Sequence, residues 1–110
     1  MEAGATEPSV TDVPDQSRYE IRLGDELVGF AAYDRRDGTI TFTHTEIDPS
    51  FEGRGLAGRL IGTALDAAAD QGLEVIPLCP YVRGYIERHR GYLPLVPVDR
   101  RERFGLPADG

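Results

Sequence analysis

Several residue types are scarce or missing in this chain of 110 residues, and their absence removes whole classes of protein. The single cysteine, Cys79, excludes an internal disulfide framework and a zinc site built from several cysteines. Long hydrophobic runs are missing too, because the apolar stretches 62–69 and 75–78 end too soon to cross a bilayer. The acidic N-terminus has no basic, apolar signal pattern, so we expect a cytoplasmic protein without a membrane partner.

Positive charge is also scarce. Twelve basic residues oppose nineteen acidic ones, which gives a formal net charge of −7. An acidic surface repels a phosphate backbone, so the composition argues against a nucleic-acid partner. All the basic residues are arginine, and neither lysine nor asparagine occurs, a bias that we attribute to GC-rich codon usage.

The pattern along the chain predicts one domain between two tails. Residues 1–16 mix proline, glycine, serine, threonine and acids without hydrophobic periodicity, and we expect them to be a flexible tail. Residues 17–98 carry the regular patterns of a folded domain, and residues 99–110 are expected to form a second flexible tail. A domain of this size has room for one modest core.

The alternation of apolar and polar residues predicts an α+β domain with a mainly antiparallel sheet and two principal helices. Gly24-Asp25 and Asp37-Gly38 have the composition of tight turns, and Gly72 is suited to end a helix. In chain order we expect strands at 18–23, 26–33 and 39–47, a helix at 56–71, a strand at 74–78, a helix at 81–90 and an extended edge piece at 92–98.

A glycine-rich turn precedes the first predicted helix. Glu52-Gly53-Arg54-Gly55 stands between the third strand and the helix that starts near Leu56. Unpaired amides and the positive end of the helix dipole attract phosphate there, and glycines let a ligand approach the backbone closely. The turn has neither the Lys-Ser/Thr of a P-loop nor the three glycines of a dinucleotide fingerprint. Another phosphate-bearing ligand is therefore indicated.

The turn resembles the coenzyme A motif of the GNAT acetyltransferases, Gln/Arg-x-x-Gly-x-Gly/Ala. Gly55-Leu56-Ala57 matches its second half, whereas Glu52 replaces the expected Gln or Arg. The stretch 42–85 resembles a small GNAT-like subfamily through His44-Thr45-Glu46, the glycine turn and Cys79-Pro80. This resemblance implies a compact GNAT-like fold with splayed central strands and acetyl-CoA as co-substrate. The implied cofactor-binding residues are Ile47, Glu52, Gly53, Arg54, Gly55, Leu56, Ala57 and Gly58.

Three residues are candidates for catalysis: Cys79, His44 and Glu46. Two-residue alternation puts Phe42 on one strand face with His44 and Glu46, so that an apolar stripe turns polar. The resemblance implies that this strand splays from the strand ending at Cys79 around the pantetheine arm. Cys79 precedes a predicted helix, where thiolate is favoured, and it is a candidate acetyl acceptor with His44 as general base. Direct transfer to the amine, with His44 or Glu46 as base, is the other route.

Each candidate also has a plain structural interpretation. Cys79 is then a buried small hydrophobe, His44 a hydrogen-bonding residue at a strand end, and Glu46 a solvated side chain. Tyr81 and Tyr85 stand one helical turn apart and are expected to pack in the core, and His89 is expected to cap a helix.

We therefore expect an enzyme that moves acetyl from acetyl-CoA to an amine on a small molecule or a protein. It needs no metal, and it is expected to be a monomer or weak dimer. Only Gly24-Asp25 joins the first two predicted strands, where GNAT enzymes usually carry helices that cover the acceptor, so the acceptor cannot be inferred from the family. The alternatives are a non-catalytic module that binds or senses acyl-CoA, and an interaction domain without a cofactor.

Overall fold

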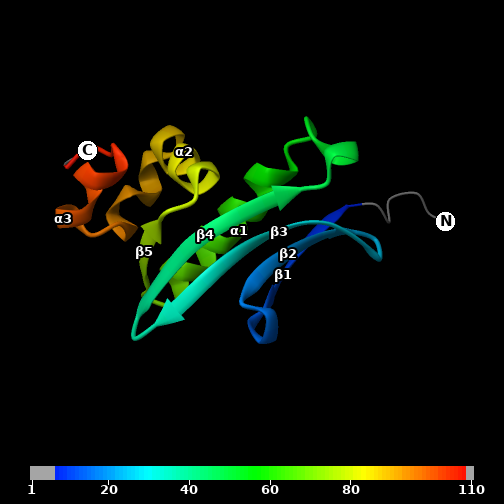
Figure 1. Cartoon of the computed structure of the whole chain (residues 1–110), viewed down its shortest axis with the longest axis horizontal. Coiled ribbons are helices and arrows are strands. Elements are labelled where there is room, and N and C mark those ends of the chain that lie inside the picture. Colours follow the sequence, from blue (N-terminus) through cyan, green and yellow to red (C-terminus); the bar gives the residue numbers. More distant parts are fainter. Residues whose placement is uncertain (1–6, 109–110) are drawn as a thin grey trace.

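A five-stranded sheet forms the centre of the computed structural model, which describes residues 7–108 (Figure 1). The strands follow one another across the sheet in chain order; the first four are antiparallel neighbours, and β5 runs parallel to β4. This confirms the predicted α+β class with a mainly antiparallel sheet. The strands are β1 (Pro8–Val13), β2 (Arg18–Leu23), β3 (Glu26–Arg36), β4 (Thr39–Ile47) and β5 (Glu74–Pro77).

Two helices of unequal length account for most of the helical structure, as predicted. Helix α1 (Leu56–Asp70) connects β4 to β5, and α2 (Pro80–Arg88) follows β5. Gly72 ends α1 at φ +70°, and the amide of Leu73 donates to the carbonyl of Ala68, which completes a glycine-ended cap. The shorter elements are α3 (Val98–Arg101) and the 3₁₀ turns η2 (Pro14–Gln16), η3 (Pro49–Phe51), η4 (Arg90–Leu95) and η5 (Glu102–Phe104).

The two faces of the sheet have different surroundings. Helix α1 contacts all five strands, and its apolar stripe, which includes Leu60 and Leu65, is fully buried against residues such as Ile21 and Phe42. Within residues 7–108, most side chains on the opposite face are exposed or half-buried; the buried exceptions include Glu20 and Ile76, which lies beside the C-terminal segment. One sheet face therefore forms the core, and the other is open to ligands.

A bulge in β4 changes which side chains face the core. Tyr33 of β3 pairs with Phe42, whereas the preceding Ala32 pairs with His44, so Thr43 is an extra residue in β4. The bulge reverses the alternation: Phe42 is buried, His44 is exposed, and Thr45 is buried in its place. The prediction that His44 and Glu46 share a face with Phe42 is therefore wrong.

The predicted flexible tail at residues 1–16 is wrong for its described part. Strand β1 pairs with β2 along its whole length, from Pro8 opposite Leu23 to Val13 opposite Arg18. An edge strand is paired on one side only and covers little core, so it tolerates prolines and polar residues. Residues 1–6 lie outside the described part of the chain.

The predicted tail at residues 99–110 is also wrong as far as the structure describes it. Phe104 and Leu106 are buried, with exposed fractions of 9% and 5%. The guanidinium of Arg101 is buried as well, and it donates to the carbonyls of Val96 at 2.9 Å and Ala108 at 2.7 Å. Two apolar residues separated by one glycine are too few to show a periodicity in the sequence, yet they fasten this segment to the core.

We expect Phe104→Ala to destabilise the fold strongly. Removing a buried phenylalanine side chain costs about 3 kcal/mol, which lowers the melting temperature of a domain of this size by more than about 10 °C. Differential scanning calorimetry measures this loss. Glu102→Ala is a suitable control, because Glu102 is exposed in the same segment and should change the melting temperature by less than about 3 °C. Equal melting temperatures for wild type and Phe104→Ala would instead support the prediction that residues 99–110 form a flexible tail.

The pairing of β5 with β4 is short, and it leaves half of β4 free. Four pairs join the two strands, from Thr39 with Glu74 to Phe42 with Pro77, whereas β4 stays paired with β3 as far as Ile47. Strands β4 and β5 therefore separate after Phe42, at the bulge. Because β5 is the last strand of the sheet, the gap lies at the edge of the sheet and not between two central strands, as the resemblance implied. The predicted extended piece at 92–98 adds no strand, because Leu93 and Val96 are buried three residues apart, which suits the 3₁₀ turn η4.

Candidate active site

The glycine turn adopts a backbone conformation that only glycine accepts readily. Gly53 has φ +83°, and Gly55, which caps the N-terminus of α1, has φ +77°. A Cβ atom built on either glycine meets nothing within 4 Å, so the backbone here lies open to solvent. The positive φ angles thus explain both glycines of the predicted motif.

The amides of this turn are available to a ligand. Intrahelical bonding begins with Arg59, whose amide donates to the carbonyl of Gly55 at 3.2 Å. Within residues 7–108, no backbone or side-chain acceptor bonds the amides of residues 53–58, and no side chain caps the helix. A row of free donors at the positive end of a fifteen-residue helix is well suited to bind phosphate oxygens.

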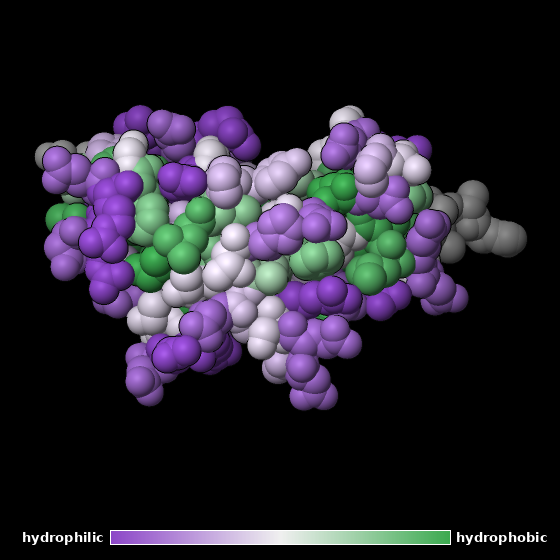
Figure 2. All heavy atoms as spheres, viewed as in Figure 1, coloured by the Kyte–Doolittle hydropathy of each residue, from purple (hydrophilic) through white to green (hydrophobic). Residues whose placement is uncertain are grey.

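A cavity of about 260 Å³ lies beside these amides. All the predicted cofactor-binding residues line it except Arg54 and Gly58; the guanidinium of Arg54 instead lies 5.0 Å from the ring centroid of Phe51. The sequence prediction missed Phe51 and Tyr81, which line the cavity as well. In the space-filling view the outline of the molecule is notched between α2 and the loop that follows β4 (Figure 2).

Cys79 occupies the position predicted for it, at the N-terminus of α2, but its partner is not the predicted one. Its thiol is 2% exposed and donates a hydrogen bond to Thr45 Oγ1 at 3.2 Å. The Cys79 amide donates to the carbonyl of Phe42, at the point where the β4–β5 ladder ends. Cys79 and Thr45 therefore lie at the base of the gap between the two strands, and the bulge that brought Thr45 there was not predicted.

His44 and Glu46 form a pair of their own on the open face of the sheet. His44 Nε2 lies 2.8 Å from Glu46 Oε2, and both side chains are more than half exposed. The ring of Phe30 is the nearest aromatic neighbour of His44, with centroids 6.0 Å apart. Because consecutive strand residues point to opposite faces, the imidazole and the Cys79–Thr45 pair lie on opposite sides of β4.

The two tyrosines of α2 have different environments. Tyr85 packs against α1, where a Cβ on Gly62 would lie 2.7 Å from its hydroxyl oxygen, as expected for a core residue. Tyr81 is 47% exposed at the cavity, so its predicted core position is wrong. His89 ends α2 with Nδ1 3.0 Å from the carbonyl of Tyr85, which confirms its predicted capping role.

Comparison with known proteins identifies the family. The family model described as "GCN5-related N-acetyl-transferase" matches residues 18–95. The chain belongs to this family. The N-acetyltransferase function is that of the family.

Individual relatives agree with this assignment. Protein NATD1 of Xenopus tropicalis is 31% identical over 51 residues, which cover 46% of this chain and 47% of that protein. The match thus spans about half the length of this relative. A GCN5-like protein from Staphylococcus aureus, solved by NMR, superposes with a TM-score of 0.64 at 16% identity, over 86% of this chain and 91% of its own. That likeness concerns the fold. Within residues 7–108, no helix is long and apolar enough to span a membrane.

Proposed function

We propose that this protein transfers an acetyl group from acetyl-CoA to an amine. The observation that carries the proposal is the row of unpaired amides at residues 53–58, beside a cavity that reaches Ile47 of β4 and Tyr81 of α2. Backbone amides and the helix dipole provide sites for a pyrophosphate, and Arg54 and Arg59 add exposed positive charge close by. Glu52 is exposed and its amide donates to the carbonyl of Pro49, so the proposed pyrophosphate site uses the amides of residues 53–58 and does not depend on the usual Gln or Arg at position 52.

The unpaired half of β4 is the proposed place for the thioester. Ile47 lines the cavity, and Thr45 lies two residues earlier on the same face, about 7 Å along a strand. A pantetheine arm that passes Ile47 therefore leads toward Thr45 and Cys79. Backbone groups of β4 beyond Phe42 have no β5 partner there, so they remain free to hold a thioester oxygen.

Direct transfer fits the arrangement of the side chains better than a route through Cys79. His44 and Glu46 lie on the open face, where an amine arrives from solvent, and together they can accept its proton. The amine nitrogen then bonds to the thioester carbon and loses its second proton, the carbon–sulfur bond breaks, and the leaving thiolate takes up a proton, so that the thiol and the amide are both neutral. Cys79 is buried and bonded to Thr45 on the other side of β4, which suits a packing role.

A titration and a turnover assay test the proposal together. We expect isothermal calorimetry to detect acetyl-CoA binding, and mass spectrometry to detect acetylated products from a panel of small primary amines. Saturating coenzyme A at about 100 times its Kd should stabilise the fold by about 2.7 kcal/mol. Binding without any acetylated product would favour the acyl-CoA-sensing module, and absence of binding would favour an interaction domain. A cytoplasmic location and a monomer or weak dimer stay predictions.

A further inference from the structure

A second cavity, of about 290 Å³, lies where β3 begins and β4 ends. Its walls are apolar on the β3 side, from Leu27 to Phe30, and carry the carboxylates of Glu46 and Asp48 on the β4 side. Leu27 is 37% exposed, and the space-filling view shows apolar surface over this end of the sheet (Figure 2). An apolar wall facing fixed charges is the usual make-up of a small-molecule site.

Both carboxylates are held in place by the protein. Glu46 Oε2 bonds to His44 Nε2 at 2.8 Å, and Asp48 Oδ1 accepts the amide of Ser50 at 2.9 Å. In the described part of the chain, the second oxygen of each carboxylate bonds to no protein group. Each carboxylate therefore presents one oriented oxygen to a ligand, unlike a freely rotating surface acid.

The spacing of these carboxylates sets the distance between two bound cations. Glu46 and Asp48 are two residues apart and line the same cavity, and two residues of extended backbone advance about 7 Å. Ile47, between them, lines the first cavity on the other face. The two cavities thus lie on opposite sides of the same three residues, in the part of β4 that has no β5 partner.

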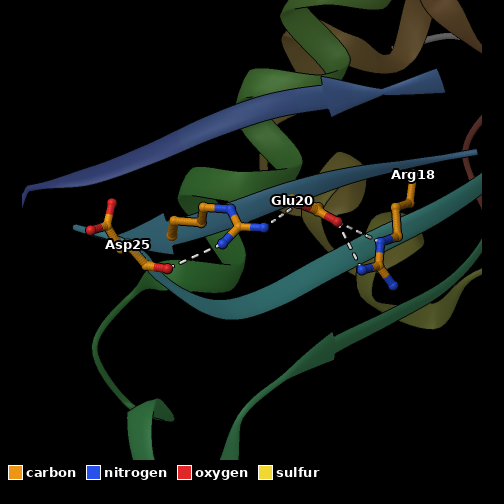
Figure 3. Close-up of polar contacts among 4 residues, drawn as sticks. Arg18, Glu20 and Asp25 are labelled. Atoms are coloured by element: carbon orange, nitrogen blue, oxygen red, sulfur yellow. Dashed lines mark hydrogen bonds and ion pairs between the residues drawn. The ribbon is translucent and has the colours of Figure 1, made fainter. Parts of the chain in front are cut away.

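Positive charge farther along the open face limits the size of the ligand. Glu20 is buried between two arginines: Arg18 Nη2 lies 2.8 Å from one carboxylate oxygen, and Arg22 Nη2 lies 3.0 Å from the other. Arg22 also donates to the carbonyl of Asp25 (Figure 3). The guanidinium of Arg18 lies 4.7 Å from the Phe30 ring centroid. The hydrogen bond from Arg18 keeps the pKa of Glu20 below its ordinary value. Arg18 and Arg22 share the single carboxylate of Glu20, so a cationic chain that extends along this part of the face meets two guanidinium groups.

We propose that the acceptor is a short aliphatic diamine bound in this second cavity. The inference rests on the proposed acetyltransferase function. The reacting nitrogen lies at Glu46, the distal ammonium bonds to Asp48, and Leu27 and Phe30 contact the methylenes. About four or five methylenes span the carboxylate spacing.

Two protons leave the reacting nitrogen during this reaction, and both have a destination. The reacting ammonium gives one proton to the His44–Glu46 pair and becomes a nucleophilic amine. A second proton leaves the nitrogen once the carbon–nitrogen bond has formed and the carbon–sulfur bond has broken. Of these two protons, one ends on the sulfur of coenzyme A and the other in solvent, while the distal ammonium keeps its charge.

Matched amines test the proposal. At saturating acetyl-CoA we expect kcat/KM to be at least about tenfold higher for putrescine or cadaverine than for n-butylamine, which lacks the second charge. Asp48→Asn removes the charge but keeps the oxygen that accepts the Ser50 amide, and it should reduce this preference to about twofold. Asp70→Asn, an exposed residue at the far end of α1, changes net charge equally and should leave the preference unchanged.

Two results would contradict the diamine proposal and leave the acetyltransferase function standing. One is equal kcat/KM for putrescine and n-butylamine, and the other is a lysine-containing peptide that is a better substrate than either diamine. Failure of every amine with acetyl-CoA bound would instead remove the acetyltransferase function. A calorimetric titration of putrescine into the protein saturated with coenzyme A supplies a readout without turnover. Binding that is at least several-fold weaker in Asp48→Asn supports the site, and equal binding in both proteins contradicts it.

Discussion

Gly55→Val should weaken the binding of coenzyme A by about 100-fold or more, which corresponds to about 2.7 kcal/mol. Gly55 has φ +77°, a conformation that a β-branched residue strongly resists. Refolding of the turn to a negative φ would turn the amides of the turn away from the ligand. If the valine kept the native backbone, its methyl groups would occupy the open space beside those amides. Calorimetric titration of wild type and variant with coenzyme A measures the change.

A matched control separates lost binding from general strain. Gly105→Val places the same side chain at φ +72°, also with no atom within 4 Å of its Cβ, in the C-terminal segment. We expect Gly105→Val to lower the melting temperature and to leave the Kd for coenzyme A within about twofold. If the two variants bound coenzyme A equally well, the glycine turn would not be the phosphate site.

The second large effect concerns the proton acceptor. We expect His44→Ala and Glu46→Gln each to lower kcat by about 100-fold with a good amine substrate, as loss of a general base does. His89→Ala is the control, because His89 caps α2 and should leave kcat nearly unchanged. Steady-state assays at saturating acetyl-CoA and amine give kcat directly, and calorimetry verifies that acetyl-CoA binding persists.

Cys79→Ala distinguishes direct transfer from the covalent route. For direct transfer we expect this variant to keep kcat within several-fold of wild type. Intact-protein mass spectrometry of wild type with acetyl-CoA, but no amine, should then show no added acetyl group. A hydroxylamine-labile acetyl adduct that disappears in Cys79→Ala, together with loss of turnover, would establish Cys79 as the acceptor and refute direct transfer.

The elements with strong local signals could be predicted from the sequence. Strand β4 has the predicted bounds, and α1 begins at the predicted Leu56, because regular alternation, turn glycines and an apolar helical stripe each act locally. Strand β1 could not be predicted, since its stability comes from pairing with β2 rather than from its own apolar content. Phe104 and Leu106 likewise depend on a core formed by distant parts of the chain.

The position and conformation of the glycine turn could be predicted from the sequence, whereas the surroundings of Cys79 could not. Positive φ and helix start are local properties, so the turn followed from its own residues. The face on which His44 lies depends on a bulge, and a bulge is set by pairing with β3. One signal was present in the sequence: Phe42 and Ile47 are both apolar, but four residues stand between them, and this even number puts them in opposite phases of a two-residue alternation. Both residues can face the core only if the strand contains an extra residue between them, and Thr43 is that residue.

The uncovered face of the sheet also bears on the timing of turnover. Many transferases close a loop or helix over their substrates, and that movement often limits their rate. His44 and Glu46 are both more than half exposed on this face, and a turn at Gly24 and Asp25 directly joins β2 to β3. An amine therefore reaches and leaves the proposed site without waiting for a segment to open. Water has the same free access, so the acetyl group is directed to nitrogen by nucleophilicity and by local charge rather than by enclosure.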